Sequence, residues 1–110
     1  MKRVTQSLSR FTKQEVDHVF KQARRVLKQA GLIILIAPQQ GHHGKILVIT
    51  PRVSGTAPQR NTIRRRLKAL YLEEKLFERG YDCIVLVKAE AMKLTFDKLK
   101  ELLLKAFESI

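Results

Sequence analysis

Three short apolar runs constrain the fold of this chain more than any other feature. They occupy residues 32–36, 45–50 and 81–88, and β-branched side chains are frequent in all of them. Runs of this length, bounded by glycine, proline and polar residues, are typical of buried strands. The sequence therefore predicts a small central sheet, in which the first two strands pair as an antiparallel hairpin across the polar loop 39–44.

Three further segments carry helix signals. Thr12 and Glu15 have the spacing of a capping box, Thr56 and Gln59 repeat it, and Thr95 can cap a last helix. Apolar residues then recur at helical spacing, and these expected core positions are Val16, Val19, Phe20, Ala23 and Leu27; Ile63, Leu67 and Leu70; and Phe96, Leu99, Leu103, Ala106, Phe107 and Ile110.

The end of the first helix is open on sequence grounds. Helix propensity alone carries it from about Lys13 to Ala30, with Gly31 as the stop. A further short strand between residues 25 and 30 is the alternative. The resulting prediction is one domain, residues 1–110, of the α+β class, with helices packed on one face of a small mixed sheet in the order helix, strands, helix, strand, helix.

The distribution of charge indicates a polyanionic partner. The chain has a net charge of +12, and the stretch from His18 to Tyr71 holds eleven lysines and arginines but no acid. Solvated surfaces ordinarily mix both signs, so a long acid-free segment in a foldable chain favours nucleic acid. No apolar run approaches the roughly 20 residues of a membrane span, and we expect no membrane partner.

The middle helix concentrates this charge. Five polar or basic residues share one face through i+3 and i+4 spacing: Arg60, Asn61, Arg64, Arg65 and Lys68. Like charges at this spacing destabilise an isolated helix, whereas phosphate oxygens match guanidinium groups in bidentate contacts. We predict RNA contact here, with a solvated basic helix as the plainer alternative.

This segment resembles the Arg-Asn-Arg signature of the bacterial ribonuclease P proteins. The likeness extends in order along the chain from about Arg10 to Phe107, through residues 19–25, the strand 45–50, the Gly-Tyr-Asp strand beginning at Gly80, and the last helix. The sequence departs from the family pattern at three places. Thr62 replaces the second arginine of the signature, Pro51-Arg52 replaces two lysines, and Val16 replaces a phenylalanine.

The resemblance implies a fold and a division of labour. It implies a two-layer sandwich of about four strands and about three helices, with an unusual left-handed strand–helix–strand crossover. It implies that the middle helix binds the catalytic ribonuclease P RNA, and that a cleft between the first helix and the sheet receives the 5′ leader of precursor tRNA. The RNA-subunit contacts would be Arg52, Arg60, Asn61, Arg64, Arg65 and Lys68, and the leader contacts would be Lys13, Phe20, Arg24 and Arg25.

On this hypothesis the protein supplies no catalytic residue. Mg²⁺ ions held mainly by the RNA partner hydrolyse the phosphodiester, and the protein needs no obligate protein partner. Phe20 on an apolar stripe is also compatible with an ordinary core position. A small RNA-binding protein without an associated nuclease, such as a ribosomal protein, is the alternative function.

Other chemistries find little support in the sequence. The adjacent His42 and His43 have no nearby cysteine or acid to complete a metal site, and the acids form no cluster that would hold Mg²⁺ for an autonomous nuclease. The single cysteine, Cys83, allows no internal disulfide. With no apolar segment after Met1-Lys2-Arg3, we expect a cytoplasmic protein.

Overall fold

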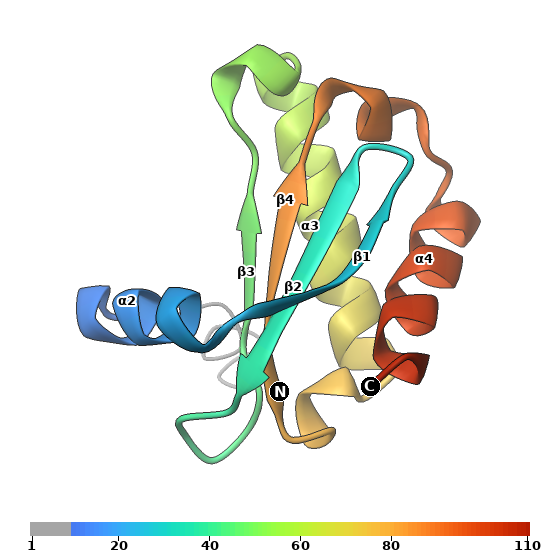
Figure 1. Cartoon of the computed structure of the whole chain (residues 1–110). Helices are drawn as coiled ribbons and strands as arrows, with labels where there is room; N and C mark the ends of the chain where they lie inside the picture. The colour runs from blue at the N-terminus through green and yellow to red at the C-terminus, as the bar shows by residue number, and fades with distance from the viewer. Residues whose placement is uncertain (1–9) are drawn as a thin grey trace.

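The computed structural model describes residues 10–110, which form a four-stranded sheet with helices on both of its faces (Figure 1). Met1-Lys2-Arg3 and the segment after it, on which the expectation of a cytoplasmic protein depends, lie outside this range. The elements in chain order are α2 (Lys13–Gln22), β1 (Arg24–Gln29), β2 (Leu32–Pro38), β3 (Ile46–Ile49), η1 (Arg52–Ser54), α3 (Ala57–Glu73), η2 (Leu76–Glu78), β4 (Tyr81–Val87), η3 (Ala89–Lys93) and α4 (Phe96–Glu108).

The strand order is β1-β2-β4-β3, which corrects the predicted hairpin between β2 and β3. β4 lies between those two strands, antiparallel to β2 and parallel to β3. β4 is apolar along both faces, so it is stabilised in the centre of the sheet with a neighbour on each side. The shared polar loop 39–44 therefore carries the chain past β4 and does not form a tight turn.

The actual hairpin joins β1 to β2, so the first helix ends at Gln22 and not near Ala30. Ala30 and Gly31 both have positive φ, of 53° and 87°, as a two-residue turn between twisted strands requires. A Cβ atom at Gly31 would lie 2.6 Å from the backbone nitrogen of Ala91. Tertiary packing of Leu27 opposite Ile34 thus overrides helix propensity in this segment.

The connection from β3 through α3 to the parallel neighbour β4 is a left-handed crossover. In Figure 1, β3 and β4 point the same way, β4 lies to the right of β3, and α3 runs behind the sheet. Connections of this kind are almost always right-handed. The expectation drawn from the family resemblance is therefore confirmed against the general rule.

The two faces of the sheet are covered unequally. One face packs on α3 and α4 and contains most of the core, including Leu67 and Phe107. The opposite face meets α2 through a small cluster around Val19, Ala37 and Ile84. This corrects the prediction that all helices share one face, and the cause is that the central strands carry apolar residues on both sides.

Two aromatic residues predicted for the core are exposed. Phe20 on α2 is 46% exposed and Phe96 at the start of α4 is 36% exposed. Of the apolar residues expected to face a core from α2, only Val19 is fully buried there. Because α2 packs on the sheet with a narrow contact, most of its apolar stripe remains accessible.

Candidate RNA-binding site

The basic face of α3 is fixed by the way this helix begins and docks. The Thr56 side chain accepts a hydrogen bond from Gln59, and the Gln59 side chain accepts one from Thr56, as predicted. Ile63, Leu67 and Leu70 are buried against the sheet and α4. Burial of that side turns the other residues of the predicted contact set outward.

Two of the arginines predicted to contact RNA donate hydrogen bonds to neutral acceptors. Arg64 donates from Nη1 to Thr50 Oγ1 at 2.8 Å and from Nη2 to Asn61 Oδ1. Arg60 donates from Nε to the Gly55 carbonyl oxygen at 3.2 Å. These bonds restrict the side chains without neutralising their charge, which is the arrangement that suits contact with phosphate.

No carboxylate of residues 10–110 forms an ion pair with an arginine of α3. The ion pairs there join Lys45 to Glu15, Lys98 to Glu101 and Lys100 to Glu74. An open groove of about 540 Å³ runs along α3 and contains no acid in its lining, which consists of Pro58, Asn61, Thr62, Arg64, Arg65 and Lys68. The structure thus brings together four of the six residues predicted to contact the RNA subunit.

Arg52 lies apart from this groove but near its start. It is exposed in η1, the short turn between the end of β3 and the start of α3. Its neighbour Val53 is 92% exposed, the most exposed large apolar residue in the described part of the chain. Figure 1 shows η1 at the same end of the molecule as the first turn of α3, so Arg52 extends the cationic surface beyond the helix.

The second candidate surface lies on the other side of the sheet, beside α2. Apolar side chains of the strands remain partly accessible there, including Leu35, Leu47, Ile49 and Leu86. Phe20 projects from α2 with nearly half of its surface exposed. An accessible ring above a partly apolar floor can stack on unpaired bases, so the exposure removes the plainer interpretation of Phe20 as core.

The register of β1 separates two residues that the sequence grouped together. Arg25 lies opposite Leu35, on the α2 side of the sheet, whereas Arg24 lies opposite Ile36, whose side chain belongs to the main core. Lys28 lies opposite Ile33 and therefore shares the face of Arg25. Sequence reasoning missed Lys28, because regular alternation would put residues three apart on opposite faces, and only the irregularity between Arg25 and Leu27 brings Lys28 to the face of Arg25.

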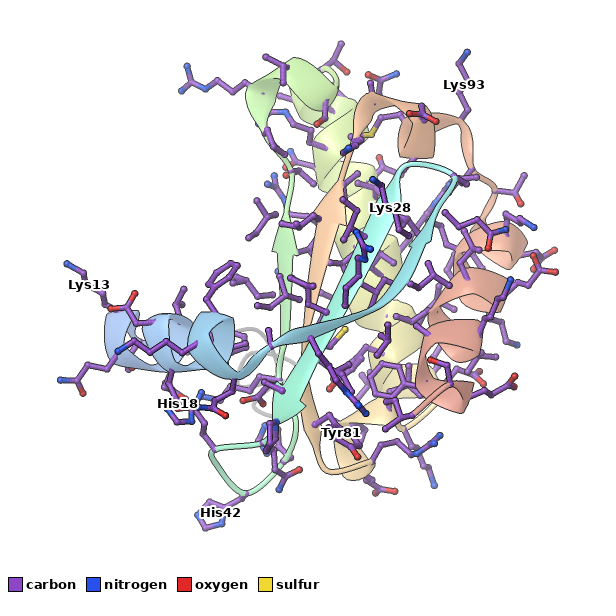
Figure 2. The ribbon with its side chains drawn as sticks, in the orientation of Figure 1. Lys13, His18, Lys28, His42, Tyr81 and Lys93 are labelled. Carbon is purple, nitrogen blue, oxygen red and sulfur yellow. The ribbon has the colours of Figure 1, made fainter. Side chains whose placement is uncertain are left out.

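Figure 2 shows Lys28 on the sheet face that α2 crosses, and Lys13 at the far end of α2. Lys13 is exposed near the N-terminus of the helix. Of the predicted leader-binding residues, Lys13, Phe20 and Arg25 are therefore spread along the α2 side of the sheet without forming a compact cluster, whereas Arg24 lies on the other face. Such spacing suits an extended strand better than a small ligand.

The position of α2 depends on Lys45. Its Nζ lies 2.7 Å from Glu15 Oε2 and 5.6 Å from the centre of the Phe11 ring. Gln40 donates from Nε2 to the Glu15 carbonyl oxygen at 3.1 Å, which ties the helix to the 39–44 loop. The hydrogen bond from Lys45 holds the pKa of Glu15 below its usual value.

The buried carboxylate of Asp82 fixes Lys45 to the sheet. Asp82 Oδ1 accepts the backbone N–H of Lys45 at 2.8 Å, at the start of β4. Asp82 is only 2% exposed, and burial raises the pKa of its carboxyl group. Asp82, Lys45 and Glu15 therefore form a chain of contacts from the sheet to α2.

The described residues contain little that suggests protein-borne metal or thiol chemistry. Residues 10–110 include no group of three histidine, cysteine or acidic side chains placed to hold a metal ion. Cys83 is fully buried, and burial raises the pKa of its thiol. In the same range, no helix is both long and apolar enough to cross a membrane.

Fold and surface together define a small α+β protein with an unneutralised cationic helix beside a mixed sheet. Solved ribonuclease P proteins share this fold. The chain matches the protein from Thermotoga maritima with a TM-score of 0.77 at 17% identity, covering 93% of this chain and 96% of that one. It matches the Staphylococcus aureus protein with a TM-score of 0.76 at 14% identity, covering 92% and 93% respectively.

The sequence supports the same conclusion independently. The family model described as Ribonuclease P matches residues 5–110, and the chain belongs to this family. It is 30% identical over 97 residues to the ribonuclease P protein component of Onion yellows phytoplasma, covering 83% of this chain and 65% of that protein. It is 28% identical to that of Petrotoga mobilis, covering 84% of this chain and 82% of that protein. The resemblance drawn from the sequence is confirmed.

Proposed function

We propose that this chain is the protein subunit of a ribonuclease P and promotes removal of the 5′ leader of precursor tRNA. Membership of the family supports the assignment. The observation that carries it is the α3 groove, in which Arg64 and Arg65 line an accessible surface without a protein carboxylate. Phosphate neutralisation by such side chains supplies sequence-independent affinity for RNA.

In this proposal the two surfaces contact different RNAs. The α3 face, with Arg52 beside it, binds the catalytic RNA, and the α2 side of the sheet binds the single-stranded leader. The two surfaces lie on opposite sides of the sheet, so both RNAs can be held at once. The protein then aligns the substrate with the catalytic RNA, and this positional effect needs no reacting side chain of its own.

The chemistry in this proposal belongs to the RNA partner. Mg²⁺ ions held mainly by the RNA would supply activation of the attacking water and stabilisation of the leaving oxygen. The protein lowers the Mg²⁺ requirement because it neutralises phosphates that would otherwise repel one another. We further propose that the particle works in the cytoplasm without an obligate protein partner, in line with a single buried cysteine, Cys83.

Reconstitution at low Mg²⁺ tests the proposal. A bacterial ribonuclease P RNA and a precursor tRNA are mixed with the protein, and removal of the leader is followed with time. We expect faster cleavage when protein and RNA are both present and none with protein alone. A protein that binds RNA but never accelerates the reaction, even with its cognate RNA, would instead be an RNA-binding protein without an associated nuclease.

A matched pair of variants makes the test specific. Arg64→Ala with Arg65→Ala removes two charges from the α3 groove. Lys105→Ala with Lys88→Ala removes two charges from exposed positions elsewhere. The first double variant should lose the stimulation at low Mg²⁺ and the second should retain it, because only the first alters the proposed interface.

A further inference from the structure

A separate pocket opens on the other flank of α3, between this helix, η3 and the start of α4. Its volume is about 230 Å³, and Arg66 and Thr62 lie at its edge. The α3 contact with β3 is on the opposite flank, where Arg64 reaches Thr50. The pocket is thus outside both the α3 contact set and the α2 surface.

The interior of the pocket is apolar and formed by buried residues. Ile63, Ala91 and Leu99 lie at its base, each no more than 4% exposed, and Met92 and Leu94 line its sides. A shallower depression of about 340 Å³ adjoins it, lined by Thr62, Arg65, Arg66, Ala69 and Phe96. The exposed ring of Phe96 therefore stands beside the mouth of the pocket.

The walls are held in place by contacts outside the pocket. Ser54 donates a hydrogen bond to the Val87 carbonyl oxygen at 2.8 Å, which fixes η1 to the end of β4, just before η3. A Cβ atom at Gly55 would lie 3.2 Å from Met92 Cγ and 2.8 Å from Gln59 Oε1. Glycine at this position lets Met92 pack against the start of α3, which fixes this wall of the pocket.

The charge around this pocket favours an anion-bearing occupant. The two depressions are lined by two arginines and no acid. Arg66 is exposed, and its side chain makes no hydrogen bond or ion pair with residues 10–110. A purely apolar partner would leave this cation without a counter-charge at the edge of the contact.

Thr62 connects the pocket to the α3 groove. It lines the groove, the pocket and the shallow depression, and Arg65 lines the groove and the depression. The family resemblance places an arginine at the position of Thr62, and a side chain of that length would extend across the mouth of the pocket. The shorter threonine leaves a continuous surface from the groove to Phe96.

We propose that this pocket binds an unpaired nucleotide of the RNA held on α3, with Arg66 on its phosphate and Phe96 stacked on a base. The inference rests on the proposed function, because it extends the same RNA surface. The volume is below the roughly 300–1,000 Å³ of sites for drug-sized ligands, and so suits one base. Aromatic and arginine side chains beside apolar walls are the usual means of holding splayed-out bases.

Met92 provides a direct probe. The chain contains two methionines, Met92 and Met1, so selective ¹³C-methyl labelling yields one resonance from the pocket. A short oligoadenylate should shift the Met92 methyl resonance, whereas inorganic polyphosphate, which carries charge but no base, should not. Equal responses to both, or no response to oligoadenylate, overturn the proposal. A shift that depends on protein concentration alone identifies a contact between copies of the chain and also overturns it.

Variants of Phe96 test the stacking. Loss of one stacked base costs about 1–3 kcal/mol, which corresponds to a fall of roughly fivefold or more in affinity. Phe96→Ala should weaken binding of a bacterial ribonuclease P RNA by this factor with no change in the salt dependence. Arg66→Ala should lower the salt slope by about one unit. Phe96→Tyr keeps the ring and should bind like the unaltered protein.

The outcomes separate this inference from the function on which it rests. If Phe96→Ala binds the RNA normally while Arg64→Ala with Arg65→Ala binds weakly, the nucleotide pocket is wrong and the proposed function stands. If the unaltered protein fails to stimulate cleavage in the reconstitution, the proposed function is wrong. A normally folded Phe96→Ala protein, checked by circular dichroism, is expected because the ring is partly exposed.

Discussion

The α3 face and the α2 side of the sheet differ in how their charges are used. On α3, the arginines contact neutral oxygens such as Thr50 Oγ1, and no carboxylate of residues 10–110 pairs with them. Beside α2, Lys45 is occupied by Glu15 and by the Phe11 ring. The cations of the α3 face are therefore available to an external anion, whereas Lys45 on the α2 side stabilises the position of α2.

The same contrast applies to apolar groups. The apolar residues of α3 are buried in the core, whereas Phe20 on α2 and several strand residues opposite the core are accessible. We infer that α3 binds mainly through phosphate, with strong salt dependence, and that the α2 side binds mainly through bases, with weak salt dependence. The following predictions test this difference.

The largest effect is expected from Arg64→Ala combined with Arg65→Ala. If each side chain contacts one phosphate, the slope of log affinity against log salt should decrease by about one unit for each, or about two in total. At moderate salt this amounts to roughly a hundredfold loss in affinity for the RNA subunit. The measurement is filter binding of ribonuclease P RNA over a range of salt concentrations.

Lys105→Ala with Lys88→Ala is the charge-matched control, with an expected small and uniform effect. An unchanged slope in the arginine variant would remove both side chains from the interface. It would also contradict the proposed difference between the two surfaces, since α3 would then not bind RNA mainly through phosphate.

The next effect is expected from Phe20→Leu. Leucine preserves an apolar contact at this position but removes the stacking ring, so affinity for single-stranded leader RNA should fall about fivefold or more. The salt slope should stay the same, because no charge changes. Binding of the leader as tight as that of the unaltered protein would show that Phe20 does not stack, and Phe20→Tyr should retain affinity if it does.

Sequence reasoning predicted the elements of this fold better than their arrangement. The capping boxes at Thr12 and Thr56 and the three apolar strands all stand where local chemistry places them. The false hairpin between β2 and β3 arose because pairing is a long-range choice, made here by the insertion of β4. Likewise, β1 was left undecided because its helix propensity is overridden by pairing with β2.

The candidate site also contains residues that local sequence patterns predict and residues that they do not. The α3 residues could be predicted because helical spacing is local, and the structure places Asn61, Arg64, Arg65 and Lys68 along one groove. The α2 surface could not be predicted as well, because Lys28 and Arg25 share a face only through the register with β2. The pocket beside Arg66 joins two segments far apart in the sequence, residues 58–66 and 91–99, and no local sequence pattern predicts it.

A smaller effect is expected from Lys45→Met. This change removes the ion pair with Glu15 and the contact with the Phe11 ring, so the N-terminal half of α2 loses an attachment to the β2–β3 loop. Partly exposed ion pairs contribute about 0.2–1 kcal/mol, which predicts a loss of up to about fivefold in leader affinity. Glu15→Gln should give a similar loss, and the double variant should lose less than the product of the two.

Affinity for the RNA subunit should be unaffected in both variants, since α3 is untouched. Equal losses for leader and RNA subunit would show that Lys45 supports the whole domain and not α2 in particular. A lower salt slope for leader binding in Lys45→Met would mean that this lysine contacts phosphate directly.

The smallest effect is a dependence of α2 attachment on acidity. The hydrogen bond from Lys45 lowers the pKa of Glu15 in the folded protein below its ordinary value of 4.5. A lowered carboxyl pKa contributes stability that is complete above the unfolded value and is lost as the pH falls through the folded value. Attachment should therefore be constant above about pH 5.5 and weaken below pH 4.5, as followed by hydrogen exchange of the α2 amides.

The contribution of Asp82 to stability changes with pH in the direction opposite to that of Glu15, so the two contributions must be measured separately. Burial raises the pKa of Asp82, so its contribution to stability is greatest at low pH and declines as the pH rises through the folded value. Asp82→Asn retains an oxygen that can accept the Lys45 N–H and removes this titration. In that background, Glu15→Gln should abolish the remaining acid sensitivity of α2 while α3 exchange stays unchanged. Acid sensitivity that persists in the double variant would place the titrating group elsewhere and separate the attachment of α2 from the Glu15–Lys45 pair.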